Sequence, residues 1–422
     1  MSSLPRSVQT EVAARDLAAR YREVRARSRA LIAPLSAEDA CVQAMPDTSP
    51  AKWHLAHVTW FFETFVLETR ERPFRAFHPA FRELFNSYYN GVGRQFPRAE
   101  RGLLTRPSLA EVLDYRADVD ARMAPLLANA DGALAATIEL GLHHEQQHQE
   151  LLLMDIKYLL AQNPLAPACR GDAVRTASVA TPLAFVPRAG GLVEVGHDAA
   201  GFHFDNETPR HQALLQPHAL ASRLVSNGEY LDFIRDGGYD KAALWLADGW
   251  SAVRAGGWRA PLYWREIDGA WFEFTLHGLA PLELAAPVCH VSHYEADAYA
   301  QWAGARLPTE FEWEAAAENA PVREARDEDA QLHPRATAED APLRDLFGAV
   351  WQWTRSAYLP YPGFRAPPGA VGEYNGKFMS NQMTLRGSCC ATPPGHARAT
   401  YRNFFYAQQR WPFTGIRLAK DA

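Results

Sequence analysis

The chain has 422 residues, 47% of them hydrophobic and 22% charged, a composition typical of a globular protein long enough for two or three domains. A formal net charge of −6 gives no reason to expect nucleic acid or an anionic membrane surface as a partner. The charged N-terminal segment lacks the apolar core of a signal peptide, and no stretch is apolar for long enough to span a bilayer.

Long helices are predicted in the N-terminal part of the chain, because apolar residues recur there every three or four positions. Ser49 and Pro50 fit the cap and first turn of the second helix. Ser108 and Glu111 form a capping box that opens the third. Together these helices predict an antiparallel four-helix bundle over residues 1–165. The predicted helices cover residues 7–35, 49–71, 108–130 and 135–162.

The helical period ends in a segment rich in proline, glycine and small residues, which predicts a linker over residues 166–182. Beyond it, short alternating runs and scattered tryptophans predict an α+β domain over residues 183–422. Its predicted strands lie within residues 190–197, 211–222 and 384–391, and its short helices within residues 227–239 and 292–318.

Histidines gather in the fourth predicted helix, within "GLHHEQQHQELLLMDIKY", and in "KWHLAH" of the second. His144 and His148 are four residues apart, so their side chains share one face of the helix. A facing helix could complete a site with His54 or His57. A lone helical histidine is usually a surface or core residue, but two pairs on two helices predict a metal site.

The identity of the metal does not follow from spacing alone. Residues 144–148 fit the H-E-x-x-H pattern of zinc proteases, in which Glu145 would be the general base. Imidazole ligands suit Fe(II), Zn(II) and Cu(II) alike. The residues therefore leave these three metals open.

The chain as a whole resembles a known family. "HLAH" and "HHEQQHQE" resemble the DinB-like metal-binding domain of the ergothioneine sulfoxide synthases (the EgtB family). The C-terminal half resembles the formylglycine-generating-enzyme-like domain, a variant C-type-lectin fold, that follows it in those proteins. The resemblance covers nearly the whole chain and implies this two-domain fold. Its landmarks in the C-terminal half are "GHDAAGFHFDNETPRH", "RLPTEFEWEAAAE", "FGAVWQWT", "LRGSCCATP", "RATYRNFF" and "WPFTGIRLA".

The resemblance implies an Fe(II) site with His57, His144 and His148 as its ligands. Glu145 would then support a ligand or lie on the helix surface. Three protein ligands leave three positions open, enough for an imidazole substrate, a thiolate or selenolate donor and O2.

The reaction implied is oxidative C–S or C–Se bond formation at imidazole C2 of hercynine, N-trimethylated histidine, with O2 as co-substrate. Gln147 and Asn403 match the family residues that contact hercynine. Phe404, with its neighbours Phe405 and Trp411, could face the trimethylammonium group, which favours aromatic rings.

The resemblance also implies residues for proton delivery and for the donor. Tyr88 and Tyr89 match a tyrosine pair of one subgroup, in which a tyrosine near O2 directs the reaction toward coupling. Arg98 and Arg101 have the spacing that holds the donor carboxylate in related enzymes. An arginine cluster of this kind is otherwise a solvated surface.

Two departures from the family pattern leave the donor open among cysteine, γ-glutamylcysteine and the selenosugar of the selenoneine synthase branch. Ser388 and Cys389 replace an expected glycine and serine, and Gln352 replaces a frequent glutamate. Cys389 or Cys390 could line a selenium site, although a buried, inert cysteine is the commoner case. Five cysteines without a C-x-x-C pair argue against a disulfide framework and favour a reducing cytoplasm.

Alternative functions remain at this stage. A zinc-dependent DinB-type hydrolase or thiol transferase would act without O2 and would not need the tyrosines. A non-enzymatic ligand-binding protein would not need three intact histidines. Formylglycine generation would leave the histidine site without a purpose. The expected partners are small-molecule substrates, with no nucleic acid and no membrane.

Overall fold

The computed structural model describes residues 6–171, 178, 181–322, 332–337 and 341–422. The chain divides into two compact units: Met1–Gln162 with Gly369–Glu373, and Asn163–Pro368 with Tyr374–Ala422. Of the predicted linker, residues 172–177 and 179–180 lie outside the described residues. The return of residues 369–373 to the first unit was not predicted from the sequence.

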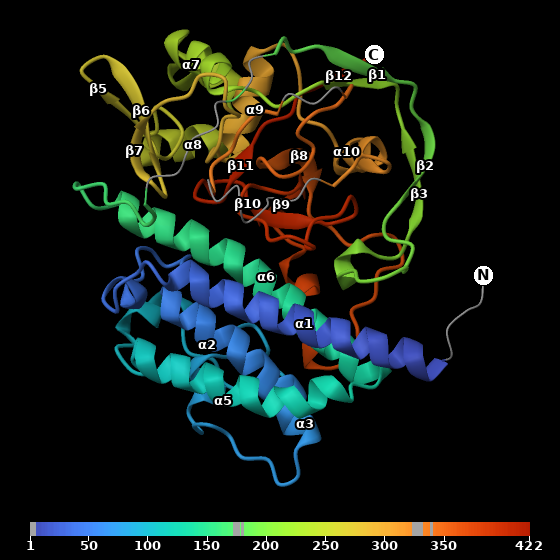
Figure 1. The fold of residues 1–422 in the computed structure, drawn as a ribbon. Helices are drawn as coiled ribbons and strands as arrows, with labels where there is room; N and C mark the ends of the chain where they lie inside the picture. Colours follow the sequence, from blue (N-terminus) through green and yellow to red (C-terminus); the bar gives the residue numbers. More distant parts are fainter. Residues whose placement is uncertain (1–5, 172–177, 179–180, 323–331, 338–340) are drawn as a thin grey trace. The chain divides into compact units, whose positions relative to one another are not determined.

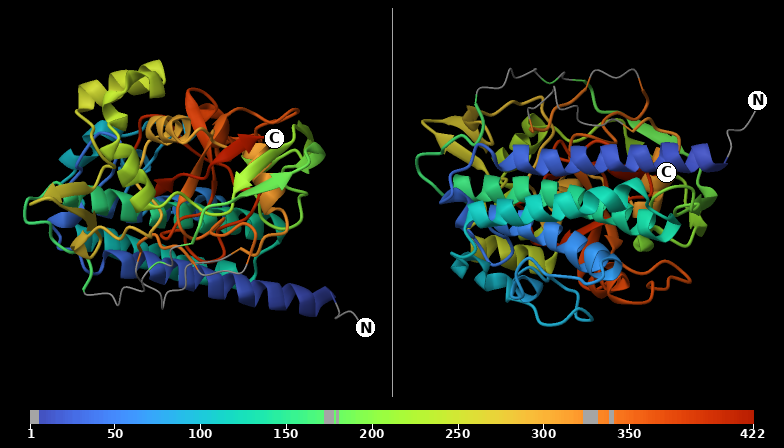
Figure 2. Two further views of the ribbon diagram at one scale, coloured as in Figure 1. Left: turned by 90° about the horizontal axis from the view of Figure 1, so that it is seen from above. Right: turned by 60° about the horizontal axis from the view of Figure 1, so that its bottom comes forward.

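The first unit is built on four long helices that lie side by side (Figure 1). Figure 2 shows the same bundle from two further directions. The predicted helical bundle is confirmed. Its long helices are α1 (Arg6–Ile32), α2 (Ala51–Phe62), α5 (Leu109–Ala128) and α6 (Gly132–Ala161). Its shorter elements are η1 (Asp39–Cys41), η2 (Glu63–Leu67), α3 (Glu68–Arg70), α4 (Phe81–Leu84) and η3 (Arg98–Leu103).

Of the two helix caps predicted from the sequence, the structure has one and lacks the other. At α5, Ser108 and Glu111 form the predicted capping box. At α2, the predicted serine cap is wrong, because Pro50 is the N-cap residue and makes no side-chain cap bond. The hydroxyl of Ser49 instead accepts a hydrogen bond from Arg101 at 2.9 Å.

The second predicted helix is longer than α2 alone, and its continuation changes pitch. After Phe62 the chain passes through a π-helical turn, η2, before the short α3. Such turns insert an extra residue into a helix and often occur at functional sites. The apolar period of the sequence does not reveal this change.

The second unit combines small sheets with short helices, as predicted. The sheet orders are β1-β4-β12, β10-β9-β8-β11, β2-β3 and β5-β6-β7, all antiparallel except the pairing of β11 with β8. The strands are β1 (Phe185–Arg188), β2 (Gly191–Val195), β3 (His211–Leu215), β4 (His218–Ala221), β5 (Trp264–Ile267), β6 (Ala270–Thr275), β7 (Gly278–Pro281), β8 (Trp351–Ala357), β9 (Gln382–Gly387), β10 (Asn403–Tyr406), β11 (Thr414–Gly415) and β12 (Ala419–Asp421). The helices are α7 (Asn227–Arg235), α8 (Ala247–Gly256), α9 (His293–Trp302) and α10 (Glu310–Ala317). The 3-10 turns are η4 (Asp205–Glu207), η5 (Gly238–Asp240), η6 (Ala242–Leu244) and η9 (Asn375–Phe378). A further turn, η8 (Ala370–Glu373), lies in the segment that belongs to the first unit.

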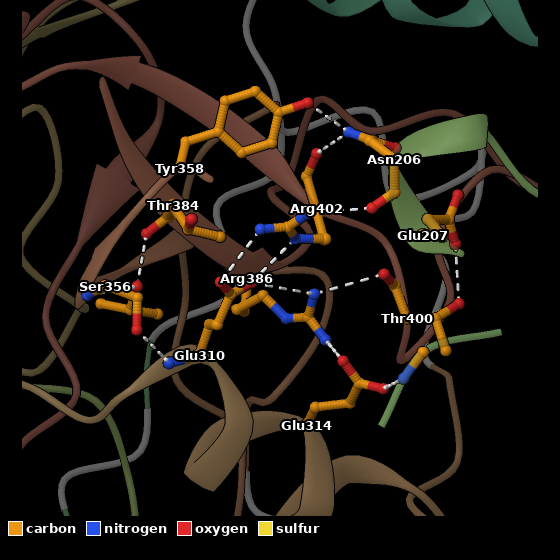
Figure 3. Close-up of polar contacts among 12 residues, drawn as sticks. Asn206, Glu207, Glu310, Glu314, Ser356, Tyr358, Thr384, Arg386, Thr400 and Arg402 are labelled. Atoms are coloured by element: carbon orange, nitrogen blue, oxygen red, sulfur yellow. Dashed lines mark hydrogen bonds and ion pairs between the residues drawn. The ribbon is translucent and has the colours of Figure 1, made fainter. Parts of the chain in front are cut away.

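Buried ion pairs join the landmark segments of the second unit (Figure 3). Arg402 holds Glu310 of α10 through two bonds of 2.9 and 3.0 Å, and Arg386 of β9 pairs with Glu314. The carboxylate of Glu207 accepts from Thr400 at 2.7 Å and also pairs with Arg398. The charged residues of these landmark segments therefore largely serve to hold distant parts of the chain together in the interior.

The positions that depart from the family pattern are also interior. Gln352 accepts from Trp313 at 2.8 Å and from Arg417 at 2.7 Å, while its amide nitrogen donates to the Leu346 carbonyl. All five cysteines are free thiols, and Cys389 and Cys390 are buried. Across the residues described, no helix has the length and apolarity needed to cross a bilayer.

Candidate metal centre

Three histidines of the first unit converge between α2 and α6. His57 lies on α2 and His144 and His148 lie one turn apart on α6, so that each imidazole offers a nitrogen within 4.8 Å of the others. In the part of the chain that the structure describes, this is the one histidine, cysteine or carboxylate cluster with such spacing. The structure thus brings together the three ligands named from the sequence.

The ring nitrogens of the cluster have distinct partners. Nδ1 of His57 donates to the Phe85 carbonyl at 2.6 Å, and its Nε2 faces Nε2 of His144 at 3.2 Å. Nδ1 of His144 is buried without a hydrogen-bond partner among the described residues. Two facing nitrogens of this kind need either a shared proton or a cation between them, so the cluster fits a bound metal ion.

Burial keeps these imidazoles neutral. It lowers the pKa of His144 to about 4. Burial, together with the neighbouring His144, also holds the pKa of His57 and of His148 well below the usual value. A neutral imidazole has the free lone pair that a metal ligand requires.

His54, the other histidine considered for the site, lies outside the three-residue cluster. Its Nδ1 is 2.9 Å from Nδ1 of His148, and its Nε2 is 3.0 Å from Oδ2 of Asp155. Asp155 was not identified from the sequence. The signal was present, because Asp155 follows His148 by seven residues and therefore lies on the same face of α6.

Glu145 is not available as a general base. Its carboxylate accepts from Ser28 at 2.6 Å and pairs with Arg25 at 3.0 Å and with Arg116, and the residue is fully buried. Burial alone would raise the pKa of Glu145, but the two guanidinium groups outweigh it and hold the pKa below its usual value. Glu145 is thus an internal ion-pair residue of the bundle, and a role in supporting a ligand histidine stays a prediction.

Aromatic rings flank His57 on α2. Trp53 stacks on its imidazole with centroids 4.6 Å apart, and Trp60 stacks at 5.6 Å. The guanidinium of Arg101 lies 3.4 Å from the centroid of the Trp53 ring. The Arg101 cation, the Trp53 indole and the His57 imidazole therefore lie one against the next.

The two tyrosines named from the sequence occupy different environments. Tyr88 is half-buried, has a left-handed backbone with φ of 69°, and its hydroxyl accepts a hydrogen bond from Arg98. Tyr89 is buried against Trp60, with centroids 5.6 Å apart. Tyr89 is therefore one residue away from His57, through Trp60, whereas the hydroxyl of Tyr88 contacts Arg98.

The two arginines also differ. Arg98 is exposed and holds Tyr88, whereas Arg101 is buried and donates to Ser49 and Ser87, each at 2.9 Å. No carboxylate of the described residues pairs with Arg101, and its buried Nε has no hydrogen-bond partner among them. Burial and the neighbouring Arg98 cation lower the pKa of Arg101. The view of the whole cluster as a solvated surface is wrong for Arg101.

The loop that carries the tyrosines is held by a residue that sequence reasoning missed. The carboxylate of Glu373 accepts from the backbone N–H groups of Asn90 and Gly91, each at 2.8 Å. Glu373 belongs to the segment that returns to the first unit. Because 282 residues separate Glu373 from Gly91, no local pattern signals the contact.

The residues expected to contact hercynine are divided between the two units. Gln147 is half-buried on α6, between His144 and His148 in the sequence. Asn403 and Phe404 lie on β10 of the second unit, where Phe404 stacks on Tyr358 with centroids 4.2 Å apart. That Gln147 and Asn403 contact one substrate stays a prediction.

Comparison with known proteins matches both halves of the chain. The family described as the DinB superfamily matches residues 20–153, and the sulfatase-modifying factor enzyme 1-like domain matches residues 172–340 and 319–422. A protein named hercynine oxygenase from Mycobacterium tuberculosis is 32% identical over 94% of this chain and 97% of its own length. The hercynine oxygenase of Mycolicibacterium smegmatis is 31% identical over 90% of this chain and 92% of its own length. Ergothioneine biosynthesis protein 1 of Schizosaccharomyces pombe is 30% identical over 52% of this chain and 28% of its own length.

Proposed function

Since the chain belongs to the EgtB family of ergothioneine sulfoxide synthases, whose relatives include the mycobacterial hercynine oxygenases, we propose that it joins sulfur or selenium to imidazole C2 of hercynine using Fe(II) and O2. The observation that carries the proposal is the cluster of three neutral imidazoles within 4.8 Å of one another. His57, His144 and His148 would hold the metal and leave positions open for substrates.

An open iron site accounts for the surroundings better than a zinc hydrolase does. The H-E-x-x-H mechanism needs a free carboxylate beside the metal. Here Glu145 is engaged by Arg25 and Arg116 in the bundle interior. Iron with O2 would supply the oxidising power that attack of a chalcogen donor on imidazole C2 requires.

A cysteine or γ-glutamylcysteine donor would be held through its carboxylate by Arg101. A buried guanidinium without an acid partner is costly, and a carboxylate ligand would remove that cost. Arg101 is in this position, with an unused buried Nε. Arg98, the cation closest to it in sequence, would assist at the exposed side. A selenosugar donor, which has no carboxylate, would not make this contact.

Tyr88 and Tyr89 would hold the proton that directs the reaction toward coupling and away from oxidation of the donor alone. Tyr88 is the better placed of the two to contact the donor, because its hydroxyl is hydrogen-bonded to Arg98, which would also assist donor binding. Gln147 of α6 and Asn403 and Phe404 of β10 would orient hercynine.

The test is anaerobic reconstitution with Fe(II), followed by hercynine, O2 and one donor at a time, with products identified by mass spectrometry. A sulfoxide adduct with cysteine or γ-glutamylcysteine would support the sulfur reaction. Coupling with a selenosugar alone would move the protein to selenoneine synthesis at the same iron site. Activity with zinc and without O2 would favour the hydrolase or transferase alternative.

Absence of any adduct despite bound iron would contradict the substrate assignment. The non-enzymatic alternative then predicts hercynine binding without consumption of O2. Tyr88→Phe and Tyr89→Phe, assayed separately, identify the proton donor: the variant that loses coupling and gains donor oxidation marks it.

A further inference from the structure

His148 differs from the other two predicted ligands in what lies behind it. His57 is tied to a backbone carbonyl, and Nδ1 of His144 has no partner among the described residues. Within the described part of the chain, hydrogen bonds connect His148, and neither of the other two, to a carboxylate through the ring of His54. It is also the one ligand that is half-buried, where the others are buried. Of the three predicted ligands, the most exposed one, His148, therefore has the longest series of hydrogen bonds behind its ring.

The hydrogen bonds that join Asp155, His54 and His148 determine which nitrogen of each imidazole carries the proton. Oδ2 of Asp155 can only accept, so Nε2 of His54 donates to it across 3.0 Å. With one proton on the His54 ring, its Nδ1 is then an acceptor. Nδ1 of His148, 2.9 Å away, must donate to it. The Nε2 of His148 is left with a free lone pair.

Asp155 is itself held in place. Its Oδ2 also accepts from the backbone N–H of Ser49 at 2.8 Å, next to the start of α2. His54 is buried, and so is Asp155. In such surroundings a histidine and a carboxylate are kept only where their hydrogen bonds are satisfied. The three groups therefore form one continuous arrangement that links α2 with α6.

We propose that His54 and Asp155 are positioning residues that hold His148 in the ring orientation and tautomer that present Nε2 to the metal. The proposal rests on the proposed function, because it requires that the three-histidine cluster hold a metal. Carboxylates that act on a ligand histidine in this way increase its basicity, and their loss weakens metal binding. In the usual arrangement the carboxylate contacts the ligand histidine directly, whereas here a second imidazole lies between them.

The experiment measures Co(II) and Fe(II) affinity anaerobically by competition with a chelator, together with the visible absorption of the Co(II) protein. His54→Phe keeps a ring of similar shape but leaves Nδ1 of His148 without an acceptor. We expect metal affinity to fall about 10- to 100-fold and the Co(II) absorption to change. His54→Gln should restore most of the affinity, because its amide oxygen can accept from His148 while its amide nitrogen donates to Asp155.

His143→Phe is the matched control, since His143 is a buried histidine of α6, the helix that carries His148 and Asp155, and takes no part in the hydrogen bonds that join His148, His54 and Asp155. Equal metal affinity and an unchanged Co(II) spectrum in His54→Phe would overturn the proposal. So would an equal loss in His54→Phe and His54→Gln, which would indicate packing alone. Should His54→Phe not fold, Asp155→Leu takes its place, because leucine offers Nε2 of His54 no acceptor, and unchanged affinity in that variant would overturn the proposal. Failure of the unmodified protein to bind either metal would instead contradict the proposed function.

Discussion

At the scale of single residues, the adjacent His144 and Glu145 of α6 face different surroundings, because successive side chains of a helix are rotated by about 100°. His144 points to the metal cluster, while Glu145 points to Arg25 and Arg116 in the bundle interior. A pattern such as H-E-x-x-H reports the face shared by its histidines. It does not report what the glutamate meets.

Glu145→Gln should therefore reduce stability and leave metal binding intact. The change leaves the buried guanidinium of Arg116 without its counter-charge and leaves Arg25 with Asp120 as its acid partner. We expect a loss of about 3 kcal/mol in the free energy of unfolding. Urea titration of the metal-free protein measures this loss. Glu139→Gln on the same helix is the control, because its pair with Arg20 is partly exposed and should contribute less than about 1 kcal/mol. Normal stability combined with lost activity would return a catalytic role to Glu145.

Arg101→Lys should weaken donor binding without removing the metal. A lysine keeps the charge but loses the planar fork that matches a carboxylate and stacks on Trp53. Loss of a hydrogen bond to a charged group, about 1.5–3 kcal/mol, corresponds to a rise in donor KM of about 10- to 100-fold. Steady-state kinetics with varied donor at saturating hercynine measures it. Arg106→Lys, an exposed arginine of the same connection, is the control. An unchanged donor KM would contradict the assignment.

At the scale of elements, the loop over residues 86–96 depends on contacts that replace regular structure. The side-chain amide of Asn86 donates to the carbonyls of Tyr89, Gly93 and Arg94. Tyr88 holds a left-handed backbone, which is unfavourable for a residue with a side chain. Glu373 then binds two backbone N–H groups at the loop tip. The loop conformation is therefore held by Asn86 from within the loop and by Glu373 from outside it.

Glu373→Ala should loosen this loop and leave the metal cluster unchanged. Without the carboxylate, the N–H groups of Asn90 and Gly91 lose their acceptor, so their hydrogen exchange should become faster. Exchange measured by mass spectrometry on peptides of this loop tests the prediction, with metal content as a second readout. Glu100→Ala removes an exposed carboxylate from the same connection and should change neither. Unaltered exchange in Glu373→Ala would show that the loop is held by its own contacts.

At the scale of the whole molecule, the sequence predicted what local periodicity encodes. Spacing of four and seven residues identifies the face of α6 that carries His144, His148 and Asp155, although Asp155 was overlooked. The capping box at Ser108 was correct because a cap is a local contact. The bond from Glu373 to Gly91 joins residues far apart in the chain, and no window of sequence contains both. The π-helical turn after Phe62 was missed because its residues keep an ordinary apolar pattern.

Both units place ionised carboxylates beside guanidinium groups in their interiors, and this arrangement governs how the molecule responds to acid. In the second unit, burial alone would raise the pKa of Glu207, but Arg398 and the hydroxyl of Thr400 hold that pKa below its usual value. The unfolded chain regains an ordinary glutamate, which binds a proton near pH 4.3. Below that pH the unfolded state binds more protons than the folded state, so stability rises with pH through this range.

The free energy of unfolding should therefore receive the full contribution of Glu207 above about pH 5 and lose it as pH falls through 4.3 toward the lowered folded pKa. Glu207→Gln cannot ionise, so the variant should be less stable than the unmodified protein at pH 7 and approach it in acid. Urea unfolding of both proteins between pH 3 and pH 7 tests this convergence. Glu194→Gln, on the more exposed strand β2, should run parallel to the unmodified protein throughout. A constant difference between Glu207→Gln and the unmodified protein at every pH would show that Glu207 contributes through packing and hydrogen bonds rather than through its charge.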